Sequence, residues 1–146
     1  MTTSPEQGLR QLLIGNIRIQ RQVKDRVYPF KAPQGAPFPF LLYSRTTSAP
    51  EHRMSGASGL RGLSFQVDGY ARSYEAMQAL REAVRLSLDG FRGPVAVGGE
   101  SIYFRHLFIE SDADAFVEPQ AAGDESIFSF SLDLSAMCPE SIPTFR

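Results

Sequence analysis

Cysteine and histidine are scarce in this 146-residue sequence, and long apolar runs are missing from it. Cys138 is the only cysteine, so a disulfide within the chain is impossible and a cysteine-based metal cluster is not expected. The two histidines, His52 and His106, fall in a predicted loop and a predicted strand, so no pattern pairs them as metal ligands. No stretch approaches the ~20 consecutive apolar residues of a membrane-spanning helix. We therefore predict no metal, no cofactor and no membrane partner.

Catalytic motifs are missing as well. The glycines of GPVAVGGES, at 93–101, lack the Lys-Ser/Thr pair of a phosphate-binding loop and follow a predicted helix instead of leading into one. Asp112 and Asp114 have the spacing of calcium ligands, but the glycine and glutamate that such a loop requires do not follow. No nucleophile elbow surrounds any serine. We predict that the chain has no catalytic residues and is not an enzyme.

Length and composition indicate one globular domain. The chain has the commonest single-domain size, and its 42% hydrophobic and 21% charged residues are ordinary for a folded protein. The first residues, MTTSPEQGLRQLLIGNI, have no basic segment before their apolar part and no small-residue cleavage site. We expect an unprocessed chain made in the cytosol, with one domain over 1–146, a flexible loop at 48–60 and a flexible tail at 137–146.

Charge is distributed unevenly along the chain. Residues 1–106 carry a net charge of +6 and residues 107–146 carry −7, which together give the overall −1. The acidic residues either cluster late by chance on a solvated surface, or the molecule has complementary faces suited to head-to-tail packing with its own copies. The strongly basic footprint of a nucleic-acid-binding protein is absent.

Two helices are predicted. Ser4 is a suitable N-cap and Pro5 a suitable first residue for a helix over about 4–19, which Gly15 and Asn16 end or bend. Ser73 caps a second helix that Gly90 ends. Its large apolar residues recur at steps of three and four, as expected for a helix that packs on a sheet, and they are Met77, Leu80, Val84 and Leu88.

The remaining segments predict a β-sheet. The closely spaced prolines of 29–39 predict a short strand followed by an extended loop. Further strands are expected at about 38–47, 61–71, 101–111 and 126–137, with a short one at 95–97, because these segments are rich in β-branched and aromatic residues or alternate in polarity. The segments 48–60 and 112–125 are predicted loops. Strand phenylalanines such as Phe104, Phe108, Phe128 and Phe130 are expected mostly in the core.

Three of these segments also match a known pattern. RVYP at 26–29, Pro39 to Tyr43, and the strand-to-helix joint VDGYARSYEA at 67–76 resemble the tail-completion proteins of long-tailed bacteriophages. This family includes tail-to-head joining and tail-terminator proteins. The resemblance covers residues from about 5 to 136 and rests on architectural motifs, since no catalytic signature anchors it. The loop 48–60 is longer than the family pattern, so contacts of that loop do not carry over.

The resemblance implies a fold and a role. The expected fold is α+β, an antiparallel sheet with two helices packed on one face, in a protomer that forms a ring, which the resemblance implies has six copies. Such rings end the tail tube in the virion and join it to the head. The implied partners are further copies, the tail tube protein and the head-tail connector or stopper protein, and DNA passes through the lumen without sequence-specific binding. A gene-transfer particle would use the same part.

Charged residues near the predicted loops are the candidate contacts of such an assembly. We expect a partly basic set, Arg45, Glu51, His52 and Arg53, to meet an acidic set, Glu110, Asp112 and Asp114, in subunit or partner contacts. A solvated surface position is the alternative for each of them. For the whole chain, the alternatives are another neck, connector or minor tail component, a small ligand-binding domain or enzyme with a ferredoxin-like sandwich, and an adaptor unrelated to phages.

Overall fold

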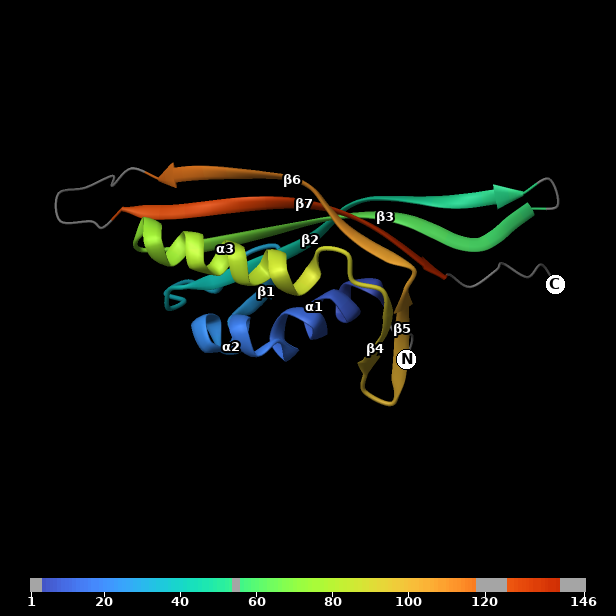
Figure 1. Cartoon of the computed structure of the whole chain (residues 1–146), viewed down its shortest axis with the longest axis horizontal. Coiled ribbons are helices and arrows are strands. Elements are labelled where there is room, and N and C mark those ends of the chain that lie inside the picture. The colour runs from blue at the N-terminus through green and yellow to red at the C-terminus, as the bar shows by residue number, and fades with distance from the viewer. Residues whose placement is uncertain (1–3, 54–55, 118–125, 140–146) are drawn as a thin grey trace.

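The computed structural model describes residues 4–53, 56–117 and 126–139, and the side chains within them except those of 49–58 and 117. The described helices and strands follow in the order α1 (Pro5–Gly15), α2 (Ile17–Val23), β1 (Val27–Pro29), β2 (Phe40–Arg53), β3 (Gly56–Ala71), α3 (Tyr74–Leu88), β4 (Gly93–Val97), β5 (Glu100–Phe104), β6 (His106–Val117) and β7 (Ile127–Pro139). Figure 1 shows the three helices on one side of a long twisted sheet.

The main sheet has the strand order β1-β2-β3-β7-β6, and β4 and β5 form a separate hairpin. The short β1 is parallel to β2, whereas every other neighbouring pair is antiparallel. The predicted α+β class with a mostly antiparallel sheet and helices on one face is therefore confirmed, with three helices in place of two. No helix among the described residues is long and apolar enough to cross a membrane.

The predicted first helix is two helices because Asn16 leaves helical geometry. Its backbone is extended, at φ −90° and ψ 126°, so it ends α1 and also caps α2 by accepting a hydrogen bond from Arg18 N. Ser4 forms a full capping box with Gln7, in which the serine Oγ accepts from Gln7 N and Gln7 Oε1 accepts from Ser4 N. The capping residues thus determine both helix starts.

The second predicted helix is confirmed as α3. Ser73 Oγ accepts a hydrogen bond from Ala76 N at 3.2 Å, and the apolar stripe predicted for the sheet-facing side is buried. After Leu88 the chain turns through Gly90, which has φ +82°, a conformation that glycine adopts without strain.

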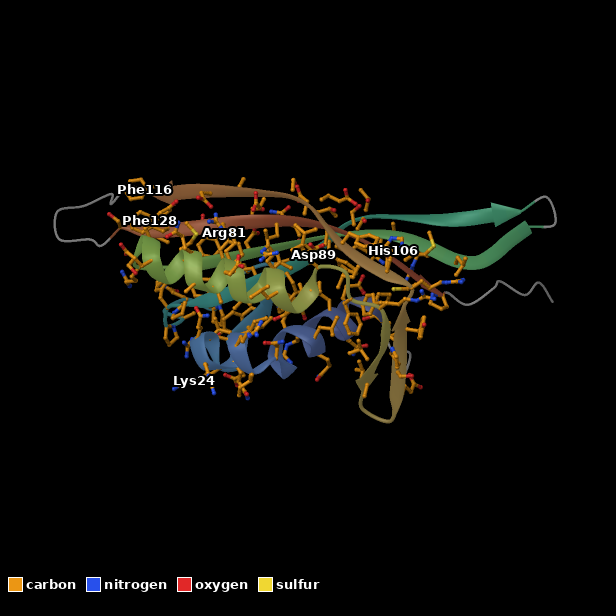
Figure 2. The ribbon with its side chains drawn as sticks, in the orientation of Figure 1. Lys24, Arg81, Asp89, His106, Phe116 and Phe128 are labelled. Carbon is orange, nitrogen blue, oxygen red and sulfur yellow. The ribbon has the colours of Figure 1, made fainter. Side chains whose placement is uncertain are left out.

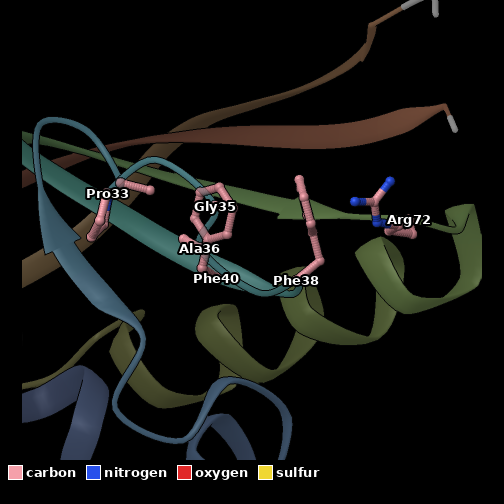
Figure 3. A pocket seen from close by; sticks show the side chains of 7 residues that line it. Pro33, Gly35, Ala36, Phe38, Phe40 and Arg72 are labelled. Atoms are coloured by element: carbon pink, nitrogen blue, oxygen red, sulfur yellow. The ribbon is translucent and has the colours of Figure 1, made fainter. Parts of the chain in front are cut away.

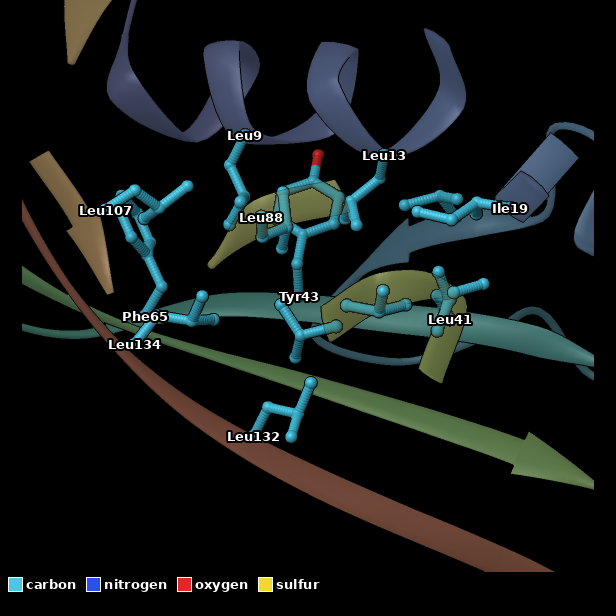
Figure 4. Close-up of a cluster of buried hydrophobic side chains, with 14 of the residues drawn as sticks. Leu9, Leu13, Ile19, Leu41, Tyr43, Phe65, Leu88, Leu107, Leu132 and Leu134 are labelled. Atoms are coloured by element: carbon cyan, nitrogen blue, oxygen red, sulfur yellow. The ribbon is translucent and has the colours of Figure 1, made fainter. Parts of the chain in front are cut away.

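The core lies between the helices and one face of the sheet (Figure 4). Leu9 and Leu13 of α1 face Tyr43 of β2, while Leu132 and Leu134 of β7 close the layer from the sheet side. All but Tyr43 are at most 1% exposed. Each large apolar side chain buried in this way contributes roughly 1.5–3 kcal/mol before entropy costs. The opposite face of β3 and β7 has no helix on it (Figure 1).

Three sequence-based predictions of secondary structure are wrong. The segment 48–60 is not a loop, because β2 continues to Arg53 and β3 begins at Gly56, forming a long two-stranded arm. Residues 112–117 of the loop expected at 112–125 belong to β6, and 118–125 lie outside the described residues. The single strand expected at 101–111 is two strands separated at Arg105, and the first of them pairs with β4. Of the predicted tail 137–146, β7 includes residues up to Pro139, and 140–146 lie outside the described residues.

These errors have a common cause. Small and polar residues such as those at 48–60 have low strand propensity, but pairing with a neighbouring strand satisfies their backbone groups and overrides that propensity. Ser48 pairs with Leu63, and Ala49 pairs with Gly62. The strand propensity of a single segment takes no account of the strand that pairs with it in the fold.

Gly69 provides a test of the core packing. It lies opposite Phe130 in the β3–β7 ladder, and a Cβ at Gly69 would be only 2.2 Å from Cε1 of that ring. We expect Gly69→Ala to lower the free energy of unfolding in urea by about 1–3 kcal/mol, because the ring must move within a packed core. The control is Gly15→Ala in the last turn of α1, where nothing lies within 4 Å, and it is expected to keep or slightly raise stability, because alanine favours a helix more than glycine does. Equal urea midpoints for both variants would contradict this packing.

Candidate assembly interface

The sheet has an open edge on β2. β1 pairs only with Leu41, Leu42 and Tyr43, and Phe30 N donates to Tyr43 O at 3.0 Å just after β1 ends. In the described residues no strand pairs with this side of β2 from Ser44 onward. The outer edge of about ten residues therefore presents backbone donors and acceptors that another strand could bind.

The other end of the strand order, β6, is sealed over only part of its length. Gly90 N donates to Leu107 O at 2.8 Å, and Ile109 N donates to Asp89 Oδ1 at 3.0 Å, so the turn after α3 covers the start of this edge. A bulge between Ile109 and Ser111 shifts the register. Beyond the bulge, in the described part of the chain, no strand covers the outer edge of β6.

Alternation of hydrogen bonding identifies the open backbone groups of β6. The groups of Leu107 and Ile109 point outward, and after the one-residue shift of the bulge the outward residues are Asp112, Asp114 and Phe116. The charges of Asp112 and Asp114 and the bulge give this edge some protection, but no proline lies between Ser111 and Val117, so every outward backbone N–H of this segment is present. This edge is therefore competent to pair with a further strand.

The two open edges lie on opposite sides of the sheet and extend in opposite directions. In Figure 1 the β2–β3 arm extends to the right, and the open end of β6 extends to the left with β7. Because β2, β3, β7 and β6 are successively antiparallel, β2 and β6 run in opposite directions. A second copy in the same orientation, placed beside the first, would therefore continue the antiparallel alternation across the junction.

The structure does not bring the two predicted charged sets together within one chain. The acidic set lies on β6. Asp112 pairs with Leu132 of β7, which pairs in turn with Val67 of β3 at the middle of the sheet. The segment 51–53 lies at the far end of the arm, where His52 pairs with Ala57. The side chains of 51–53 are outside those described.

Three of the remaining predicted residues have partners in their own chain, and the fourth, Asp112, is exposed. Arg45 forms an ion pair with Glu6 at 3.3 Å. Glu110 Oε1 accepts a hydrogen bond from Ser135 Oγ at 2.7 Å. Asp114 forms an ion pair with Arg81 of α3, which Figure 2 labels beside the end of β6. Exposed ion pairs contribute little to stability, so Arg45 and Asp114 can exchange partners at low cost.

The central part of the helix-free face of the sheet is polar. Its residues there, from Ser64 to Tyr70 on β3 and from Ser129 to Ser135 on β7, are Ser64, Gln66, Asp68, Tyr70, Ser129, Ser131, Asp133 and Ser135. Gln66 Nε2 donates to Asp68 and to Ser131 Oγ at 3.1 Å, and Ser111 Oγ donates to Asp133 at 2.9 Å. These eight positions carry two carboxylates and no basic side chain, so this part of the face is hydroxyl-rich and negative.

Sequence reasoning missed the exposed aromatics. Phe104 and Phe130 are buried as predicted, but Phe108 is 47% exposed and Phe116 is 50% exposed. Phe30 is 76% exposed and has φ +62°, which is unusual for a bulky residue. For Phe116, the sequence signal that could have indicated exposure was its position, two residues after Asp114 in a segment where polar and apolar residues alternate.

A surface hollow of about 370 Å³ lies under the proline-rich loop (Figure 3). Phe38 and Phe40 form its wall, and the Arg72 guanidinium lies 4.4 Å from the Phe38 ring centroid. Its lining contains no carboxylate and no histidine, so no acid-base pair converges there. Among the described residues no group of three potential ligands could hold a metal ion.

The comparisons with known proteins agree with this architecture. The sequence model of the family described as "Tail completion protein gp17" matches residues 7–120, most of the chain. The chain belongs to the tail completion protein gp17 family. No curated protein matches it by sequence. A chain in a solved structure titled "Virion of native gene transfer agent (GTA) particle" has the same fold, with a TM-score of 0.63, 15% identity, and coverage of 90% of this chain and 91% of that chain.

Membership of this family places the protein in the virion tail, because a tail completion protein is a structural component of that tail. The resemblance stated from RVYP, the proline-led strand and the VDGYARSYEA joint is thereby confirmed. Those motifs correspond to β1, the start of β2 and the β3–α3 junction. These motifs lie where the first two strands of the sheet begin and where α3 follows β3.

The lone thiol of this tail completion protein is expected to be inert. Cys138 is buried, and desolvation raises its pKa to about 11 despite the opposing influence of Arg61. A thiol with a raised pKa stays protonated from pH 7 to pH 9 and reacts slowly. We expect a thiol reagent at pH 8 to label the native protein at least about 10-fold more slowly than the urea-unfolded protein. Equal rates, followed by absorbance, would show that Cys138 is accessible in the native state.

Proposed function

We propose that copies of this tail completion protein form a hexameric ring that ends the tail tube at its head-proximal end and joins it to the head connector or stopper. The observation that carries the proposal is the pair of open strand edges. They lie on opposite sides of one sheet and run in opposite directions, as a head-to-tail contact between identical copies requires. The chain then acts as a structural part and not as an enzyme.

In the proposed contact, the open end of β6 pairs with the open part of β2 in the next copy. Within one chain these two segments are offset along the strand direction. Traced across β7 and β3, the open part of β6 lies beside β2 residues up to Ser44, whereas the open part of β2 begins at Ser44. Neighbouring copies must therefore be displaced along the strands, by roughly seven residues or about 23 Å. Such a stagger is what tilts strands when a sheet closes into a barrel.

The dimensions of this assembly suit a tail channel. Four strands about 4.8 Å apart span about 19 Å, so the stagger corresponds to a tilt near the roughly 45° found in barrels. Six copies then supply about 24 strands, and a closed barrel of that size is about 50 Å across between backbones. After the side chains that project inward from opposite sides of the barrel are allowed for, the lumen is still wide enough for a DNA duplex.

We propose that the helix-free face lines this lumen. Asp68, Asp133 and the serines around them present negative charge and hydroxyl groups. A negative wall repels phosphates, so DNA would pass without sequence-specific binding or adhesion. The helices would then lie on the outside of the ring.

The candidate contact residues take separate roles in this arrangement. Arg45 lies beside the open part of β2, and Asp112 and Asp114 lie beside the open part of β6, so the proposed junction brings them together across two copies. Glu110 is at the bulge where β6 opens. Glu51, His52 and Arg53 are at the far end of the arm and are proposed to contact the tail tube or the connector.

A neck, connector or minor tail component with the same fold is the second candidate, because open strand edges would serve any ring in the particle. Electron microscopy of particles carrying a labelled copy distinguishes the candidates. Label at the tube end next to the head supports the proposal, and label elsewhere supports the second candidate. A small-molecule function has less support, since the hollow at Phe38 lacks converging acid-base groups.

Blocking the β6 edge should prevent ring formation. Asp112→Pro removes an outward N–H but none of the inward hydrogen bonds to β7, so the monomer should still fold. We expect ring formation, measured by light scattering with multi-angle detection, to be weakened at least about 10-fold, the equivalent of one lost hydrogen bond of 1.4 kcal/mol. Asp112→Ala keeps the N–H and serves as the control. Equal assembly of the two variants would exclude pairing through this edge.

The arm is expected to contact a partner outside the ring. Alanine at Glu51, His52 and Arg53 together should leave ring formation unchanged, because these residues lie beyond the proposed junction. We expect the triple variant to lose capping of purified tail-tube protein, seen as longer tubes by electron microscopy. Tubes as short as those made with the native protein would remove 51–53 from the partner contact.

A further inference from the structure

Phe116 is an exposed aromatic at the open end of β6. It is 50% exposed and packs on one side against Phe128, with ring centroids 5.1 Å apart (Figure 2). It lies on the helix-bearing side of the sheet, because Asp114, two residues earlier, contacts Arg81 and Tyr74 of α3. An aromatic side chain held in this way on a strand is suited to insert into a neighbouring surface.

A hollow of about 260 Å³ lies at the opposite edge of the sheet, where β1 stops. It is lined by Glu6, Pro29, Phe30, Tyr43, Ser44 and Arg45. Tyr43 belongs to the core and Glu6 to α1, so this hollow is also on the helix-bearing side. Its walls are mostly apolar, with polar groups from Ser44 and from the Glu6–Arg45 ion pair, and it is large enough for one aromatic ring.

The proposed strand pairing determines which residues meet there. When β6 of one copy lies antiparallel beside β2 of the next, the last residues of β6 approach the first open residues of β2. β1 ends at Pro29, opposite Tyr43, so the incoming strand can advance only to about Ser44 and Arg45. At that limit Phe116 is opposite Arg45, and Asp114 is one diagonal position away, within reach of its guanidinium.

We propose that Phe116 of one copy inserts into the hollow beside Phe30 of the next copy and determines the register of the ring. The inference rests on the proposed function, because it names the contact through which the ring closes. Arg45, which is 42% exposed in its ion pair with Glu6, also meets Asp114 of the incoming strand. The occupant is therefore a second copy, favoured by matching strand direction, matching face and opposite charge.

The backbone of Phe30 agrees with an assembly role. A non-glycine residue at φ +62° is strained, and in the free chain the Phe30 ring gains little from burial because it is 76% exposed. Insertion of a second aromatic ring beside it would bury both rings and compensate that strain. Asparagine tolerates this backbone conformation, so Phe30→Asn removes the ring without disturbing the turn.

Cysteine cross-linking tests the contact directly. Phe30 follows β1 and Phe116 lies on β6, the two opposite edges of the sheet, so a disulfide between them within one chain is excluded by the strands between. Under oxidation, the variant with both Phe30→Cys and Phe116→Cys should give a ladder of covalent oligomers on a non-reducing gel. The matched control pairs Phe30→Cys with Phe108→Cys, another exposed β6 phenylalanine, and should give none.

Side-chain truncation provides the second measurement. Phe116→Ala and Phe30→Asn should each weaken ring formation at least about 10-fold in light scattering. The control Leu86→Ala, at an exposed leucine of α3, should not. If rings form in the native protein and neither cross-linking nor truncation has the expected effect, this contact is wrong and the ring stands. A native protein that stays monomeric with and without tail-tube protein overturns the ring and this contact together.

Discussion

The antiparallel pairing of β2, β3, β7 and β6 is the constraint on which both the fold and the assembly depend. On one face of these strands, residues such as Phe65 and Leu132 are buried against the helices. On the other face, Gln66 and Asp133 are polar. An even number of alternating strands leaves the two edge strands running in opposite directions. The same pairing that builds the core therefore leaves edges that fit each other between copies.

Edge strands are normally protected, and this molecule protects its edges selectively. The turn at Asp89 and Gly90 covers the first part of β6, and β1 covers the first part of β2. The uncovered segments lie at opposite ends of the molecule, which restricts each edge to one mode of pairing. In the proposed ring, this partial coverage would convert a general aggregation hazard into a contact with a defined register. A ring that ends a polymer requires this property, because its copies must close on themselves.

The agreement between sequence and structure varies with the range of the interactions. Ser4 and Ser73 cap helices through bonds to residues three positions away, so the sequence shows them directly, whereas Asn16 was expected only to end or bend a helix and not to cap a second one. The α3 stripe is likewise visible, because helical spacing identifies the buried side. The arm at 48–60 was not predictable in this way, since its strands are stabilised by each other and by β7. For the same reason Phe108 was misassigned to the core and Phe116 to a loop.

The sequence by itself determined the local features of this protein, namely its helix starts, its alternating strands, the absence of a catalytic or metal-binding motif, and the family motifs at RVYP and VDGYARSYEA. Only the tertiary structure decided which strand edges stay open, where Phe30 and Phe116 lie, and that Arg45 and the acidic residues of β6 are on opposite edges. The physical reason is that caps and periodicity depend on neighbours within one turn or strand. Whether a strand edge is open, by contrast, depends on whether a segment distant in the sequence pairs with it.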